Sequence, residues 1–187
     1  MITATDIYPN YVAGTWKLDP SHSEVSFTVK HLMISKVRGT FDSFDVTIVS
    51  APDVRDSTIS ATIDIASVNT KSEARDAHLR TSDFFQADEH PTMTFNSTSF
   101  DGDATNGKFT VVGNLTLRGI TREVTLAGEF GGVITDDYGN TKAGATATTK
   151  INRQDFGVAW NAAIEAGGMT LGDEVTITLD IQVVLEK

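Results

Sequence analysis

The sequence predicts an all-β protein, built as an antiparallel β-barrel of about eight strands with one short helix near a barrel end. Apolar and polar residues alternate along most of the chain, as they do in strands that bury one face. Hairpin-type turns such as Asn106-Gly107 and Arg118-Gly119 separate the alternating segments, and long crossovers are few. This pattern leaves a sandwich or a barrel, and we expect an up-and-down barrel because closure removes exposed sheet edges.

The expected strands share a period of two residues. A first strand is expected near residues 11–18, and a second places Val25, Phe27 and Val29 on one face. One long strand is expected over 36–49, and one of small residues over 142–151. The other strands have their apolar series at Ile59, Ala61, Ile63, Ile65; Met93, Phe95; Phe109, Val111, Gly113, Leu115, Leu117; Val124, Leu126; and Val175, Ile177, Leu179, Ile181, Val183, Leu185.

A single helix is expected from about Lys71 to Arg80. Thr70 and Glu73 have the spacing of a capping box, in which each side chain satisfies the other's end of the first turn. The helix has few apolar residues, so it should pack against one end of the barrel rather than form a core of its own. The adjacent aromatics Phe84 and Phe85 follow it and should point in different directions.

Composition fits one domain over residues 1–187, with about the first 10 residues as an N-terminal extension. The chain has 25 acidic and 15 basic residues, giving a net charge of -10. Such a surface cannot neutralise several phosphates, so nucleic acid is excluded as a partner, and an anionic membrane should repel the chain as a whole. No cysteine is present, which excludes disulfides, thiolate metal sites and a cysteine nucleophile.

The first residues contain no lysine, no arginine and no apolar run of signal-peptide length. No stretch of the sequence approaches the roughly 18 apolar residues that a membrane-spanning helix needs. We therefore expect a cytoplasmic protein that does not span a membrane.

The small residues over 142–151 predict an incompletely filled interior. One face of this strand has Ala143, Ala145 and Ala147, and the other has glycine and threonine, so either face is small. The facing strands present large aromatic side chains, and an apolar interior with open space is typical of a ligand pocket. In the alternative interpretation, the aromatic rings fill the alanine side and the core is sealed. The aromatic residues are Phe27, Phe41, Phe95 and Phe109.

The four histidines, at positions 22, 31, 78 and 90, lack the spacing that places two imidazoles on one strand or helix face. Ser21 and His22 are sequence neighbours on an extended segment, so they point to opposite faces and cannot form a nucleophile and base pair. We therefore expect no metal, no cofactor and no catalytic residue.

His31 continues the inward series of its strand, so its imidazole should reach the barrel rim. There it could gather with Arg38 on the next strand and with His78 and Arg80 on the helix, and such a cluster suits the polar head of a lipid. In the alternative interpretation these residues cap the helix and satisfy loop carbonyls. A long connection is also expected over 157–172, near an opening and with Trp160 close to a ligand.

Five ordered motifs resemble the YceI-like family: Trp16 to His31, Val37-Arg-Gly-Thr-Phe41, Arg75 to Arg80 with Phe84-Phe85, Gly113 to Thr121, and Arg153-Gln-Asp-Phe-Gly157. The resemblance runs from about Tyr11 to the C-terminus. It implies an extended, lipocalin-like barrel whose tunnel holds a long isoprenoid or a related amphiphile, with no enzyme activity established for the family as a whole.

We therefore predict a carrier or store for a long-chain isoprenoid, such as a polyprenyl chain or an isoprenoid quinone, with the lipid as its partner. Two alternatives remain: an enzyme acting on a lipophilic substrate with His31 or His78 as general base, and a sealed barrel acting through its surface. The sequence leaves a homodimer open. The predicted tunnel lining is Phe27, Val29, Phe41, Phe84, Phe85, Phe95, Phe109, Ala145, Ala147 and Trp160, and the predicted head-group residues are His31, Arg38, His78 and Arg80.

Overall fold

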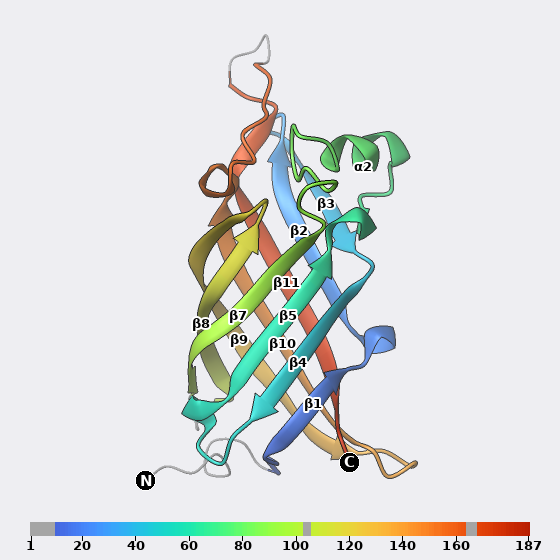
Figure 1. The fold of residues 1–187 in the computed structure, drawn as a ribbon, viewed down its shortest axis with the longest axis vertical. Helices are drawn as coiled ribbons and strands as arrows, with labels where there is room; N and C mark the ends of the chain where they lie inside the picture. Colours follow the sequence, from blue (N-terminus) through green and yellow to red (C-terminus); the bar gives the residue numbers. More distant parts are fainter. Residues whose placement is uncertain (1–9, 103–105, 164–167) are drawn as a thin grey trace.

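The expected antiparallel barrel is present and closes on itself (Figure 1). The computed structural model describes residues 10–102, 106–163 and 168–187, so the expected N-terminal extension lies almost entirely outside the described residues. The strands are β1 Gly14–Leu18, β2 Glu24–His31, β3 Ser35–Phe41, β4 Phe44–Ser50, β5 Thr58–Asp64, β6 Val68–Asn69, β7 Thr92–Gly102, β8 Lys108–Leu117, β9 Ile120–Thr135, β10 Thr141–Asn152 and β11 Leu171–Leu185.

Eight of the strands in the described residues form the closed ring, in the order β1-β4-β5-β7-β8-β9-β10-β11. Closure comes from β1, which pairs with β4 on one side and with the end of β11 on the other, so that Trp16 lies opposite both Ile48 and Leu185. The strands β2, β3 and β6 extend the same wall towards the upper end in Figure 1, where β2 pairs with β11 beyond β1. The barrel is therefore long and narrow.

The expectation of one long strand over 36–49 was wrong, because the chain bends at Asp42 and Ser43 between β3 and β4. Two neighbouring parts of the chain are interrupted near the same level. The 3-10 helix η1 (Pro20–His22) separates β1 from β2, and η3 (Ile65–Ser67) separates β5 from β6. Backbone hydrogen bonds cross this level: the Asp42 N–H donates to the Ser67 carbonyl at 3.1 Å, and the Asp64 N–H donates to that of Ser43 at 2.9 Å. Backbone pairing therefore continues past the interruptions.

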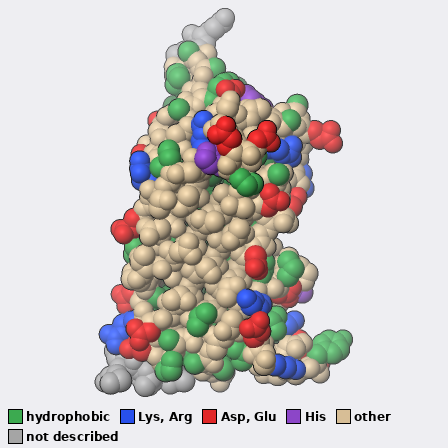
Figure 2. Space-filling model, viewed as in Figure 1, with side chains coloured by type: hydrophobic (Ala, Val, Ile, Leu, Met, Phe, Trp, Pro, Cys, Tyr) green, Lys and Arg blue, Asp and Glu red, His purple; other side chains and the backbone are tan. Residues whose placement is uncertain are grey.

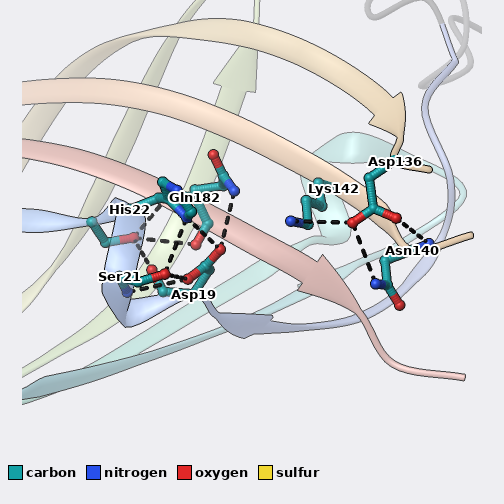
Figure 3. A network of polar contacts seen from close by, with 8 residues as sticks. Asp19, Ser21, His22, Asp136, Asn140, Lys142 and Gln182 are labelled. Atoms are coloured by element: carbon teal, nitrogen blue, oxygen red, sulfur yellow. Dashed lines mark hydrogen bonds and ion pairs between the residues drawn. The ribbon is translucent and has the colours of Figure 1, made fainter. Parts of the chain in front are cut away.

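Asp19 stabilises the first of these interruptions (Figure 3). Its carboxylate accepts hydrogen bonds from the Ser21 hydroxyl at 2.6 Å, the His22 ring Nδ1 at 2.9 Å and the Gln182 side-chain amide at 3.1 Å. The hydrogen bonds from Ser21 and then His22 lower the pKa of Asp19 to about 2. The network links η1 to β11. The expectation that Ser21 and His22 point to opposite faces was wrong, because both lie in η1 and 3.1 Å separates Ser21 Oγ from His22 Nδ1.

A second carboxylate orders the β9–β10 turn at the lower end of the barrel (Figure 3). Asp136 accepts the backbone N–H groups of Tyr138 and Asn140, both at 2.9 Å, and pairs with Lys142 at 3.2 Å. The backbone hydrogen bond from Asn140 contributes most to lowering the pKa of Asp136 to about 2. The turn is thus held by the Asp136 carboxylate, which accepts two backbone N–H groups and also pairs with Lys142.

The short helix α2 (Glu73–Leu79) flanks the upper end of the barrel, as expected (Figure 1). The expected capping box was wrong, because Ser72 is the N-cap and its hydroxyl accepts the Arg75 N–H at 3.4 Å. Lys71 has a φ of 65° and so cannot belong to the helix. Thr70 instead donates its hydroxyl to the buried Asp76 carboxylate at 2.6 Å.

Glycines on the barrel wall help to explain why the aromatic rings leave the barrel open, and Gly39 and Gly128 are two of three that lie under a ring, the third being Gly113 under Phe95. Gly39 lies opposite Phe27, and Gly128 lies opposite Phe109, on neighbouring strands. A Cβ atom at either glycine would overlap the facing phenyl ring, so each ring lies directly over a glycine. The rings therefore lie along the wall instead of projecting across the interior.

One face of the outer surface carries its charges mainly towards the two ends. On the face shown in Figure 2, lysine, arginine and acidic side chains gather near the upper and lower ends, while the middle is mostly uncharged. On this face the two ends are therefore the charged parts of the surface.

Candidate functional site

Two adjoining cavities occupy the barrel interior. The lower cavity has a volume of about 220 Å³ and the upper cavity about 250 Å³. Three residues line both of them, namely Val25 on β2, Met93 on β7 and Ile177 on β11. We call these three residues the waist, because the two cavities meet end to end there.

The lower cavity presents almost no free polar group. The Tyr11 hydroxyl donates to the Ala51 carbonyl at 2.7 Å, and the Ser50 hydroxyl accepts from Trp16 Nε1 at 2.8 Å and donates to the Val12 carbonyl at 2.7 Å. These polar groups are satisfied by the protein itself, so an apolar chain would displace no hydrogen bond from them. Most of the remaining lining is aliphatic or aromatic, including Val46, Ile48, Ile59, Ile63, Val111, Leu115, Val124, Leu126, Ile181 and Val183.

The upper cavity combines apolar walls with polar groups. Trp160, His78 and Phe84 form an aromatic cluster whose ring centroids lie 5.0 to 5.3 Å apart. The ring of His78 also contacts Asp83, with 2.8 Å between Nε2 and Oδ2. The further polar residues that line this cavity are Ser26, His31, Arg75, Arg153 and Thr170. An amphiphile would find polar partners here that the lower cavity lacks.

Arg153 is buried at the upper end, with only 4% of its surface exposed. Its Nε donates to the Gly172 carbonyl at 2.8 Å, and its Nη1 donates to the carbonyls of Val158 at 2.7 Å and Trp160 at 2.8 Å. Its Nη2 lies 3.5 Å from an Asp173 carboxylate oxygen but makes no hydrogen bond within the described residues. Burial lowers the pKa of Arg153. The guanidinium thus holds the segment that carries Trp160 and adds positive charge beside the upper cavity.

All ten residues of the predicted lining border one of the two cavities. Phe95, Phe109, Ala145 and Ala147 line the lower cavity. Phe27, Val29, Phe41, Phe84, Phe85 and Trp160 line the upper one. The alanine face of β10 is the inward face. Their part in ligand binding remains a prediction.

The predicted head-group cluster is only half assembled. His31 and His78 line the upper cavity. Arg38 does not, because it lies opposite Thr28 on the outward face of β3, between the inward positions Val37 and Gly39. Arg80 is also absent from the lining, since its Nε donates to the Ala66 carbonyl at 3.1 Å. The expected gathering of four residues was therefore wrong for the two arginines.

Sequence reasoning missed Arg153 as part of the interior, and it placed the waist residue Met93 in the apolar series of its strand without naming it as tunnel lining. Arg153 directly follows the long inward series of β10 and belongs to the motif Arg153 to Gly157, a signal that could have drawn attention to it. The long connection after residue 156 runs at the upper end as expected, although residues 164–167 lie outside the described residues.

The histidines do not gather into a metal site. Within residues 10–102, 106–163 and 168–187, no three His, Asp or Glu side chains come together in a way that could hold a metal ion. His22 contacts Asp19, and His78 contacts Asp83, in two separate places. No helix of the described chain is both long enough and apolar enough to cross a bilayer.

Comparison with known proteins assigns residues 16–183 to the model of the YceI-like domain. A similar relative is the UPF0312 protein SA2479 of Staphylococcus aureus (strain N315), which is 45% identical over 161 residues, covering 84% of this chain and 90% of the relative. The resemblance therefore extends over nearly the whole barrel.

Solved structures share the fold. The Campylobacter jejuni YCEI protein is 33% identical, with a TM-score of 0.73, and the match covers 91% of this chain and 97% of that protein. BcnA of Burkholderia cenocepacia has a TM-score of 0.74 at 23% identity, covering 88% of this chain and 98% of BcnA. A polyisoprenoid binding domain from Saccharophagus degradans has a TM-score of 0.70 at 16% identity, covering 91% and 98%.

Proposed function

This chain belongs to the YceI-like family, and from that premise we propose that it carries or stores a long-chain isoprenoid or a similar amphiphilic lipid inside its barrel. The observation that carries the proposal is the pair of apolar cavities that meet at the waist. The Saccharophagus degradans domain of the same fold is named for binding polyisoprenoid, which supports the same ligand class.

The shape of the interior favours one long chain over a compact ligand. A chain that passes Val25, Met93 and Ile177 can occupy both cavities, whereas a compact molecule fits only one of them. Burial of apolar surface contributes about 25 cal/mol per Å² removed from water, so affinity should rise with chain length until both cavities are filled. The methionine at the waist is flexible enough to adapt to a branched chain.

The distribution of polar groups orients the ligand. The head group lies in the upper cavity near His31, His78 and Arg153, and the tail lies in the lower cavity. The reverse orientation would bury a polar head in a cavity whose polar side chains, Thr149 apart, are already bonded within the described residues, and an unpaired buried polar group is costly. No covalent step is required.

The test is extraction of the purified protein with organic solvent, followed by mass spectrometry. We expect a long-chain isoprenoid or similar amphiphile in about one copy per chain. Delipidated protein should take up octaprenol more tightly than farnesol, because only the longer chain fills both cavities. A protein that releases no lipid and takes up neither compound would contradict the proposal.

A further inference from the structure

A second feature at the upper end is an exposed apolar surface, which we call the upper apolar tip and define as Leu32, Met33, Ile34 and Met169. Their surfaces are exposed by 36%, 60%, 86% and 44%, respectively. The first three form the β2–β3 turn, and Met169 comes from the connection that precedes β11. Adjacent exposed apolar residues of this kind commonly mark an interaction site.

The two segments of the tip are held together. The Leu32 N–H donates to the Thr170 carbonyl at 2.7 Å, and a Cβ atom at Gly168 would lie 3.6 Å from Met33 Cγ. Leu32 and Met33 also have φ angles of 53° and 62°, a conformation that turns usually give to glycine, asparagine or aspartate. Large apolar side chains are therefore unusual at these two positions, and turn geometry does not explain them.

Basic residues flank the tip. Lys30 and Lys36 lie opposite each other on β2 and β3, both are exposed, and neither side chain makes an ion pair or hydrogen bond within the described residues. Like charges directly opposite each other on neighbouring strands destabilise a sheet. An external anion would relieve this repulsion.

The nearest acidic residues along β11 already have partners. Asp173 lies 3.5 Å from Arg153 and accepts a hydrogen bond from Gln154 at 3.2 Å, and Glu174 lies 3.4 Å from Lys150. Among the described residues, the base of the tip therefore carries two unpaired lysines, Lys30 and Lys36, on a chain whose net charge is -10.

The tip also adjoins the upper cavity. His31, Thr170 and Leu171, which are sequence neighbours of the tip residues, line that cavity. We propose that the upper apolar tip, with Lys30 and Lys36, docks the protein on the surface of a bilayer that contains anionic lipids. The apolar side chains enter the boundary between head groups and acyl chains, and the lysines meet the phosphates. In this orientation the upper cavity lies next to the membrane.

The net charge of the chain is compatible with this docking. The sequence led us to expect repulsion from an anionic membrane, and that expectation holds for the molecule as a whole. At physiological ionic strength, however, charges separated by more than about 8 Å are largely screened, so the lysines at the contact outweigh distant carboxylates. Binding should therefore be weak, specific to one orientation and sensitive to salt.

The test is flotation of the full chain with vesicles of phosphatidylglycerol and phosphatidylcholine in equal amounts. The wild type should bind these vesicles and bind phosphatidylcholine alone more weakly. Met33→Ser combined with Ile34→Ser should abolish most binding. Lys30→Gln combined with Lys36→Gln should weaken it by about fivefold for each lysine at low salt. These side chains are exposed, so the variants should fold, and circular dichroism checks that they do.

Matched controls lie at the lower end. Ile134 and Tyr138 are exposed by 65% and 87%, and Lys17 and Lys108 are exposed lysines. Ile134→Ser with Tyr138→Ser, and Lys17→Gln with Lys108→Gln, should bind vesicles like the wild type. Failure of the wild type to bind, or equal binding by the tip and control variants, would overturn the proposal. Octaprenol uptake is measured separately, so failed docking with normal uptake leaves the proposed tunnel function standing.

Discussion

Replacing Ala145 with phenylalanine tests whether the barrel interior is open space. Ala145 lies on β10 between Phe130 of β9 and Ile181 of β11, and it lines the lower cavity. Thr146, the next residue, is exposed on the outside of the same strand. Ala145→Phe and Thr146→Phe therefore introduce the same ring on opposite sides of one wall.

The size of the cavity sets the expected magnitude. The lower cavity measures about 220 Å³, and a cavity of about 150 Å³ holds a benzene ring, so the new side chain should fit and occupy most of the space. Filling empty volume gains up to about 24 cal/mol per Å³, whereas crowding a packed site costs about 1 to 3 kcal/mol. These terms largely offset, so the unfolding free energy of lipid-free Ala145→Phe should stay within about 2 kcal/mol of wild type.

The assay combines thermal melts of lipid-free protein with uptake of octaprenol. For a chain of this length about 1 kcal/mol shifts the melting temperature by about 2–4 °C, so Ala145→Phe should melt within about 8 °C of wild type. Its octaprenol uptake should fall by roughly tenfold or more, equivalent to about 1.4 kcal/mol. Thr146→Phe should match the wild type in both measurements. An Ala145→Phe protein that takes up octaprenol normally would refute the reasoning.

Three further predictions follow from the same structure. Gly128→Ala should push the Phe109 ring into the lower cavity, which should cost about 1–3 kcal/mol in denaturant unfolding and reduce octaprenol uptake; normal values for both would contradict the close approach. The pKa of Asp19 falls from 3.8 to about 2 on folding, so its stabilising contribution of about 1–2 kcal/mol should be present above about pH 4 and lost as the pH falls towards 2. Asp19→Asn should lose that contribution at neutral pH and flatten this part of the stability profile, as urea midpoints across the acid range will show; an unchanged profile would count against the network. Trp160 emission should shift when octaprenol fills the upper cavity, and constant emission at saturation would contradict its place in the lining.

Strand parity explains why the tunnel lining could be predicted. Side chains alternate between the two faces of a strand, so one apolar series identifies the inward face of a whole strand. Parity also carried a signal for the break in the strand expected over 36–49. The inward positions change from odd numbers up to Phe41 to even numbers from Phe44, and a continuous strand does not allow that change.

The head-group residues were harder to predict. Arg38 was predicted to join the head-group cluster inside the barrel. It alternates with the inward residues Val37 and Gly39, so strand parity places its side chain on the outside. Arg80 follows a helix, where no strand period applies. The helix start was predicted at Thr70, but the helix begins after Ser72, because the positive φ of Lys71 excludes an earlier start.

Arg153 shows a limit of a different kind. Charged residues are almost never fully buried unless they are paired, so a sequence gives little reason to place an arginine inside. Its burial depends on carbonyls of Val158, Trp160 and Gly172, which the fold brings together from the connection and from β11. Such partners become visible only when the topology is known.

The most direct test of the central claim is a crystal structure of the protein loaded with octaprenol. The account predicts one continuous chain of electron density through both cavities, passing between Val25, Met93 and Ile177. The hydroxyl end should lie in the upper cavity, near His31, His78 and Arg153. Density outside the barrel, or a chain confined to one cavity with its hydroxyl in the lower one, would contradict the account.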